Sequence, residues 1–146
     1  MRVLFAILFI CVSVNGQSQE ALRKKYGPPI SETLTIRPGV FVTVSYAETG
    51  DVCEMIIHPQ QLTLDLNSPI TETMQSTTLT EIIDEVVPRS QRGKLIMGTF
   101  LNIVCLPLNN CFGAMSTYER VTIRRIGGDD KERYARIRWE GRACRK

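Results

Sequence analysis

The chain has 146 residues, of which 43% are hydrophobic and 23% are charged, and its formal net charge is +3. This length is enough for one hydrophobic core and not for two, and the composition excludes the disordered and fibrous classes of protein. The charge is uneven, because residues 17–117 carry 7 basic and 10 acidic side chains, whereas residues 118–146 carry 10 basic and 5 acidic ones. Such an asymmetry concerns solubility and partners rather than fold.

The first residues have the pattern of a secretory signal peptide. Arg2 supplies a basic start, residues 3–14 are almost all apolar, and the small residue Gly16 precedes a polar stretch. The apolar run is shorter than the roughly 20 residues that a membrane span needs, although an uncleaved anchor is the alternative. We therefore predict a signal peptide at residues 1–16 and a single domain at 17–146. The protein would be secreted or periplasmic, with no transmembrane segment after cleavage.

Cleavage after Gly16 would leave an even number of cysteines, which are Cys53, Cys105, Cys111 and Cys144. In an oxidising compartment this predicts two disulfides, for which three connectivities are possible. The short intervening loop favours a Cys105–Cys111 bond, and Cys53–Cys144 would then tie the first strands to the C-terminus. Buried free thiols, behaving as small hydrophobic side chains, are the alternative.

The first half of the mature chain predicts one helix and a three-strand meander. Residues 18–26 form the expected helix, which Ser18 caps and Gly27 stops, and which is too short to form without docking. Alternating apolar residues separated by turn signals then predict strands at 31–37, 40–46 and 52–58. Residues 60–76 are expected to be an extended connector, with a short edge strand as the alternative.

The second helix is the best-marked element of the sequence. Thr78 and Glu81 have the spacing of a capping box, and Pro88 ends the helix at or before residue 87. The apolar residues that follow helical spacing are Leu79, Ile82, Ile83, Val86 and Val87. Residues 89–94 are expected to be a basic loop.

The C-terminal part predicts further strands. Residues 95–104 are apolar enough for a buried strand, and residues 117–126 and 133–140 form a hairpin around a Gly-Gly-Asp-Asp-Lys turn. The order of elements predicts an α+β fold. It consists of an antiparallel sheet, built from a meander plus a C-terminal hairpin, with two helices packed on one face. Disulfides crosslink the fold.

The sequence carries no familiar catalytic or metal-binding motif, and we predict no cofactor. His58 is the only histidine, and its odd separation from Cys53 puts the two on opposite faces of a strand, which disfavours a Cys–His dyad. One histidine with disulfide-bonded cysteines leaves no zinc set. The enzyme alternative is a small secreted hydrolase that uses two converging carboxylates, drawn from Glu32, Glu54, Glu119 and Glu140.

The arginines of the final hairpin are the least ordinary feature. Strand periodicity predicts that four of them lie on one solvent face of adjacent strands, namely Arg120, Arg124, Arg136 and Arg138. Guanidinium groups bind carboxylates and phosphates in a bidentate manner, which makes this face a candidate anion-binding site. A solvated face with interleaved glutamates is the competing interpretation.

These observations favour an exported, non-catalytic binding module. Its partner would be an acidic protein, a glycan or a lipid headgroup, whereas nucleic acid is not expected because the arginine face lacks interleaved aromatic residues. A third hypothesis is a structural or inhibitor-like protein that presents the Cys105–Cys111 loop. The interaction residues at the tip of that loop would be Leu106, Pro107 and Leu108.

The N-terminal part also resembles one known family. A helix that ends in Tyr26-Gly27-Pro28-Pro29, followed by a hairpin and a Gly50-Asp51 turn, is similar to the helix-then-hairpin part of small bacterial outer-membrane assembly lipoproteins. The lipid-attachment cysteine of that family is missing from this chain. The resemblance implies the local fold only, and no function.

Overall fold

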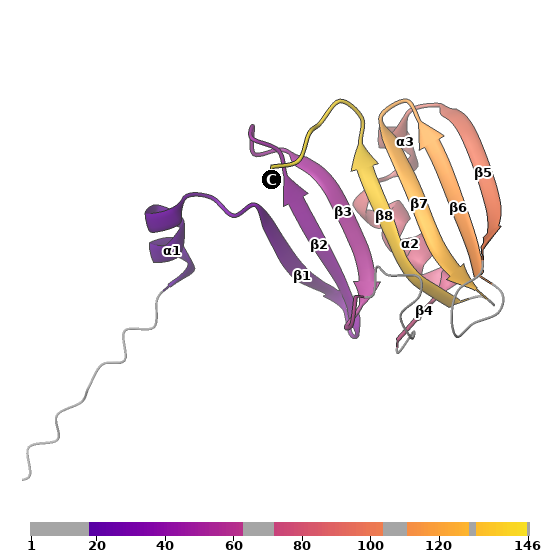
Figure 1. Ribbon diagram of the computed structural model, residues 1–146, viewed down its shortest axis with the longest axis horizontal. Helices are drawn as coiled ribbons and strands as arrows, with labels where there is room; N and C mark the ends of the chain where they lie inside the picture. Colours follow the sequence, from indigo (N-terminus) through magenta and orange to yellow (C-terminus); the bar gives the residue numbers. More distant parts are fainter. Residues whose placement is uncertain (1–17, 63–71, 104–110, 129–130, 146) are drawn as a thin grey trace, which may run out of the picture.

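The computed structural model describes residues 18–62, 72–103, 111–128 and 131–145 (Figure 1). They form eight strands of one sheet and three helices. In chain order, the elements are α1 (Gln19–Tyr26), β1 (Ser31–Arg37), β2 (Val40–Tyr46), β3 (Val52–Pro59), β4 (Met74–Gln75), α2 (Ser76–Val86), α3 (Arg89–Arg92), β5 (Leu95–Ile103), β6 (Cys111–Tyr118), β7 (Val121–Gly128) and β8 (Lys131–Trp139).

The sheet consists of two antiparallel meanders joined side by side. Its strand order is β1-β2-β3-β8-β7-β6-β5, and the short β4 pairs with one end of β8. The junction is antiparallel too, because β3 pairs with β8 with Met55 opposite Ile137. The α+β class and the antiparallel sheet are thus confirmed, with a C-terminal meander of four strands in place of a hairpin.

Helix α2 covers one face of the sheet and builds the main core. Its buried residues Leu79, Ile82 and Ile83 belong to one cluster with sheet residues such as Val42 and Ile137. Figure 1 shows α2 behind the strands, close to β8. Each large side chain buried in this way stabilises the fold by about 1.5–3 kcal/mol relative to leaving it exposed.

We call the other face of the sheet the open face. Strand alternation places six side chains of β7 and β8 on it, which are Thr122, Arg124, Ile126, Tyr134, Arg136 and Arg138. A second, smaller apolar cluster lies at one end of this face, where Ile56, Ile126 and Tyr134 are buried and Leu62 packs against them. Thr122 and the three arginines cover the rest of the open face on β7 and β8.

The long-range disulfide is confirmed. Cys53 and Cys144 are bonded, with their Cα atoms 5.4 Å apart and a sequence separation of 91. The bond fastens the C-terminal segment to the first meander, where Cys144 also forms a backbone bridge with Ala47. The predicted Cys105–Cys111 bond involves one residue and one side chain outside the described part of the chain.

The expected signal peptide, residues 1–16, and the loop tip, residues 106–108, also lie outside the described residues. No helix in the described ranges is both long and apolar enough to cross a membrane.

The helices differ from expectation in three details. Helix α1 has no buried residue and lies beyond β1, where Arg23 forms an ion pair with Glu32 (Figure 1). Helix α2 begins at Ser76 without a side-chain cap, so the predicted Thr78–Glu81 capping box is wrong. The β4–β8 pairing fixes the backbone up to Gln75, so the helix starts two residues before the predicted cap. The expected basic loop contains α3 instead, and its Arg92 is buried.

Strand β5 contradicts the prediction of a buried strand. It is an edge of the sheet, and most of its large apolar side chains are exposed. The predicted strand over 117–126 is also divided, because the chain turns at Glu119 and Arg120 between β6 and β7. Backbone hydrogen bonds from Glu119 to Lys94 and from Arg120 to Arg92 hold this turn against the start of β5.

Candidate anion-binding face

Three of the four predicted arginines lie together on the open face. Arg124 of β7 is directly opposite Arg136 of β8, and Arg138 is opposite Thr122. Residues that face each other in this way have Cβ atoms about 4.5–5.5 Å apart, and like charges at that distance destabilise a sheet. The fold therefore places two arginines directly opposite each other on neighbouring strands.

One carboxylate, that of Glu54, contacts two of these three arginines. Glu54 of β3 is opposite Arg138 in register, and its Oε2 accepts hydrogen bonds from Nη2 of Arg138 at 2.7 Å and from Nε at 3.1 Å. The same oxygen lies 3.8 Å from Nε of Arg136. The carboxylate is largely covered, with 14% of its side chain exposed, whereas the Arg138 side chain is 61% exposed.

Arg124 differs from the other two arginines of the open face. It is exposed, and no acidic side chain forms an ion pair with it in the described part of the chain. Three positive charges and one negative charge leave this patch of the open face with a net charge of about +2. We call Arg124, Arg136, Arg138 and Glu54 the arginine patch.

Arg120 does not join the patch. Arg120 lies in the β6–β7 turn rather than in a strand, and it lines a cavity of about 400 Å³. The other lining residues are Gln91, Glu119, Trp139, Glu140 and Arg142. Because β7 begins only at Val121, strand alternation does not assign the Arg120 side chain to either face of the sheet.

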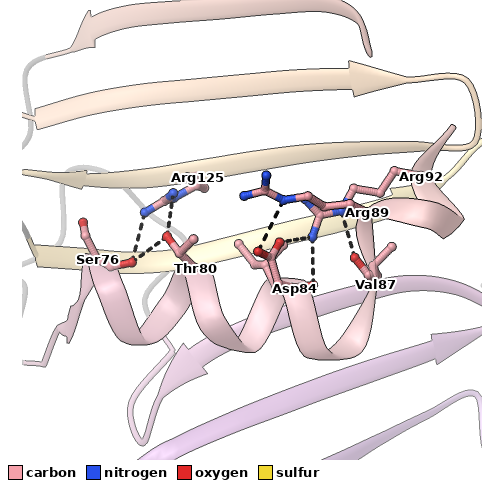
Figure 2. Close-up of polar contacts among 8 residues, drawn as sticks. Ser76, Thr80, Asp84, Val87, Arg89, Arg92 and Arg125 are labelled. Carbon is pink, nitrogen blue, oxygen red and sulfur yellow. Dashed lines mark hydrogen bonds and ion pairs between the residues drawn. The ribbon is translucent and has the colours of Figure 1, made fainter. Parts of the chain in front are cut away.

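Arg125 and Arg92 serve the fold on the opposite side of the sheet (Figure 2). Arg125 of β7 reaches the start of α2, where its Nη1 donates to Oγ1 of Thr80 at 3.2 Å. It also pairs with Glu132, a fully buried carboxylate that accepts a hydrogen bond from Ser76 at 2.7 Å. Arg92 binds the other end of α2. Both arginines have acidic partners, which sets them apart from Arg124.

The Cys–His alternative finds no support in this geometry. Cys53 is in the disulfide, and His58 is 5% exposed. Both ring nitrogens of His58 have partners, since Nδ1 lies 2.7 Å from the carbonyl oxygen of Pro59 and Nε2 lies 3.0 Å from Oγ1 of Thr43. In the described ranges, no cluster of three or more His, Cys, Asp or Glu side chains could hold a metal ion.

Two of the four candidate carboxylates come to one place. Glu119 and Glu140 both line the cavity beside Arg120. Each already accepts a hydrogen bond, Glu119 from the backbone N–H of Lys94 and Glu140 from Thr122. The other two lie elsewhere, Glu32 with Arg23 and Glu54 in the arginine patch.

The sequence identifies Glu54, the acidic member of the arginine patch, only as a candidate catalytic carboxylate. The signal that identifies its position is its even spacing from His58 and Ile56 in the alternating strand, which places it on the open face.

Comparisons of the chain with protein-family models, curated proteins and solved structures gave no match. Side-chain geometry and charge are therefore the basis for inferring the function of this protein.

Proposed function

We propose that the protein is a non-catalytic binding module, exported from the cell, whose arginine patch binds an extended polyanion. The observation that carries this proposal is the direct opposition of Arg124 and Arg136 on adjacent strands with one carboxylate for three arginines. Such an arrangement costs stability in the free protein. A bound anion between the guanidinium groups removes that cost.

The geometry favours a partner with several anionic groups in a row. Neighbouring strands are about 4.8 Å apart, and residues two apart on one strand are separated by about 6.6 Å. Arg124, Arg136 and Arg138 therefore present a short array of planar donors over two strands. Sulfate, phosphate and carboxylate groups repeated at such spacings, along a glycan, a lipid surface or an acidic peptide, share the required chemistry.

The test compares three polyanions of different origin: heparin, poly-glutamate and vesicles that contain phosphatidylserine. We expect the wild-type protein to bind at least one of them. The variant Arg124→Glu with Arg136→Glu should bind it at least about tenfold more weakly, because each charge-assisted hydrogen bond contributes about 1.5–3 kcal/mol. Titration calorimetry or vesicle sedimentation gives the affinity. The polyanion that binds identifies the class of partner.

The matched control is Arg120→Glu with Arg142→Glu. Both arginines are exposed and line the separate cavity, so this variant has the same net charge as the test variant. It should keep most of the affinity. An equal loss in both variants would show that net charge alone drives binding, and binding to none of the three polyanions would contradict the proposal.

A second candidate function is the hydrolase. The observation that favours it is the shared cavity of Glu119 and Glu140, which also offers Trp139 as an apolar wall. Paired carboxylates of this kind could act as general acid and base. The test is hydrolysis of fluorogenic glycoside or ester substrates by the wild-type protein. Hydrolysis that is lost in Glu140→Gln and kept in the control Glu48→Gln would show that the protein is an enzyme rather than a binding module.

The loop hypothesis stays a prediction, since Leu106, Pro107 and Leu108 lie outside the described residues. Replacement of Leu106 and Leu108 by alanine tests it. Unchanged partner binding would remove the loop from consideration.

A further inference from the structure

Within the described residues, strand β5 has a neighbouring strand on one side only. It is the last strand in the order of the sheet and pairs with β6 alone among the described strands. An edge strand of nine residues, Leu95–Ile103, has unpaired N–H and C=O groups along its outer side. Another extended segment could extend the sheet there by main-chain hydrogen bonds.

The side chains of β5 are unusual for an exposed edge. Its large apolar residues have exposed fractions of 58% for Leu95, 67% for Ile96, 49% for Met97, 65% for Phe100 and 57% for Leu101. The strand contains no charged residue. Charged side chains are a common protection of edge strands against pairing, and the opposite edge, β1, contains two of them.

We propose that two copies of this chain pair through β5, as antiparallel strands related by a two-fold axis at Thr99. In this register Met97 of one copy faces Leu101 of the other, and Phe100 faces Gly98 of the other copy. The position of a Cβ atom on Gly98 has no atom within 4 Å, so the aromatic ring has open space to occupy. The central part of the strand, residues 97–101, is thus complementary to itself on both faces.

A second copy suits this strand because its uncharged apolar side chains then contact apolar side chains, whereas a charged partner would have to bury its charges against them. Thr99 faces its own counterpart at the axis, and cross-strand threonine pairs form favourable contacts. The arrangement is isologous and closed, since each β5 edge covers the other. A closed pair also explains how a long apolar edge avoids open-ended association.

The pairing has a consequence for the arginine patch, and this consequence alone rests on the proposed function. A two-fold axis perpendicular to the sheet keeps both open faces on the same side. The dimer would therefore present two copies of Arg124 and Arg136 to one polyanion, which increases avidity without new contacts. Dimerisation itself does not depend on what the patch binds.

The test is sedimentation equilibrium of the full purified chain and three variants. We expect the wild-type to dimerise and each of Met97→Lys and Leu101→Glu to weaken the dimer by about tenfold or more, because a charge then faces an apolar side chain. The double variant Met97→Lys with Leu101→Glu should recover most of the affinity, since each lysine then faces a glutamate of the other copy. Only a pairing between copies in this register gives that recovery.

The matched control is Leu34→Lys on the other edge strand, where Leu34 is 49% exposed. It should leave the dimer unchanged. A wild-type protein that is monomeric at roughly 100 µM, a control that dissociates the dimer equally, or a double variant without recovery would each overturn the proposal.

A second measurement needs no variant. Amide hydrogen exchange of the wild-type protein should slow in β5 as its concentration rises, whereas β1 should exchange at a constant rate. Exchange in β5 that is independent of concentration would also overturn the proposal.

Discussion

Glu54 sets the charge of the arginine patch. Its carboxylate is the acidic group that Arg138 and Arg136 share, and it is 14% exposed. A polyanion on the open face must compete with this carboxylate for the two guanidinium groups. Arg124, by contrast, is available without competition from an acidic side chain in the described residues. The net charge of the arginine patch therefore depends on one residue of β3.

Removal of that charge should strengthen binding. We expect Glu54→Gln to bind the polyanion about three- to tenfold more tightly than the wild-type, because the two arginines become free for the ligand. Isothermal titration calorimetry measures the change. The control Glu85→Gln makes the same change in net charge at an exposed residue that pairs with Arg37. Equal gains in the two variants would contradict a local role for Glu54.

At the residue scale, strand alternation in the sequence was enough to place Arg124, Arg136 and Arg138 on one face. It does not extend to Arg120, which precedes β7, because the exact start of that strand depends on contacts that join distant segments. Gly93 and Lys94 pack against Glu119, and a Cβ atom on Gly93 would lie 2.7 Å from the Glu119 carboxylate. A turn held in this way has no local signature. Likewise, the partner of Arg138 is in β3, 84 residues earlier in the chain.

At the element scale, helix α2 is held by side chains from outside it. Arg92 of α3 donates from Nε to the carbonyl oxygen of Val87 at 2.8 Å and from Nη2 to that of Ile83 at 3.2 Å (Figure 2). Both carbonyls lie at the C-terminal end of the helix, and that of Ile83 also accepts from the backbone N–H of Val87 at 3.0 Å. The positive charge also suits the negative end of the helix dipole. Arg92 thus adds side-chain hydrogen bonds to the C-terminal end of α2.

Replacement of Arg92 should destabilise the protein. We expect Arg92→Met to lower the free energy of unfolding by about 2 kcal/mol, a value that allows for the partial exposure of its partner Asp84. Urea denaturation measures the loss. Arg89→Met is the control, because Arg89 lies 3.5 Å from the same carboxylate with 81% of its side chain exposed. It should cost less than about 1 kcal/mol. Similar losses in both would rule out a special role for Arg92.

The sequence predicted β1, β2 and α1 almost to the residue, since their apolar spacing and turn residues are local signals. It did not predict the place of β5. A continuous apolar run has the same appearance in a central strand and in an exposed edge strand. What decides between them is the strand order, and this follows from the pairing of β3 with β8. Pairing between segments far apart in sequence has no periodicity from which it can be predicted.

At the scale of the whole molecule, the Cys53–Cys144 bond joins the first meander to the end of the chain. It closes a long loop, since the two cysteines have a sequence separation of 91. In the chain-entropy description, a crosslink of this length stabilises the native state by about 4–5 kcal/mol through the unfolded ensemble. The bond also keeps the C-terminal segment beside the end of β2, where the backbone N–H of Arg145 donates to the carbonyl oxygen of Tyr46 at 3.0 Å.

We therefore expect Cys144→Ser to lower the free energy of unfolding by about 4 kcal/mol. Thermal or urea denaturation measures the loss, and the oxidised wild-type treated with reductant should show a similar one. The control is Ala143→Ser, which adds a hydroxyl beside the bond at an exposed position and leaves the bond intact. A difference of less than about 1 kcal/mol between the two variants would contradict the assigned role of the disulfide.

The central claim is that the open face binds a polyanion through Arg124, Arg136 and Arg138. The most direct measurement is a titration of the isotope-labelled protein with heparin oligosaccharide, followed by the amide chemical shifts. We predict that the largest shifts occur in β7 and β8 around these three arginines and at Glu54 of β3. Largest shifts around Gln91, Arg120 and Arg142, or no shift at saturating heparin, would contradict it.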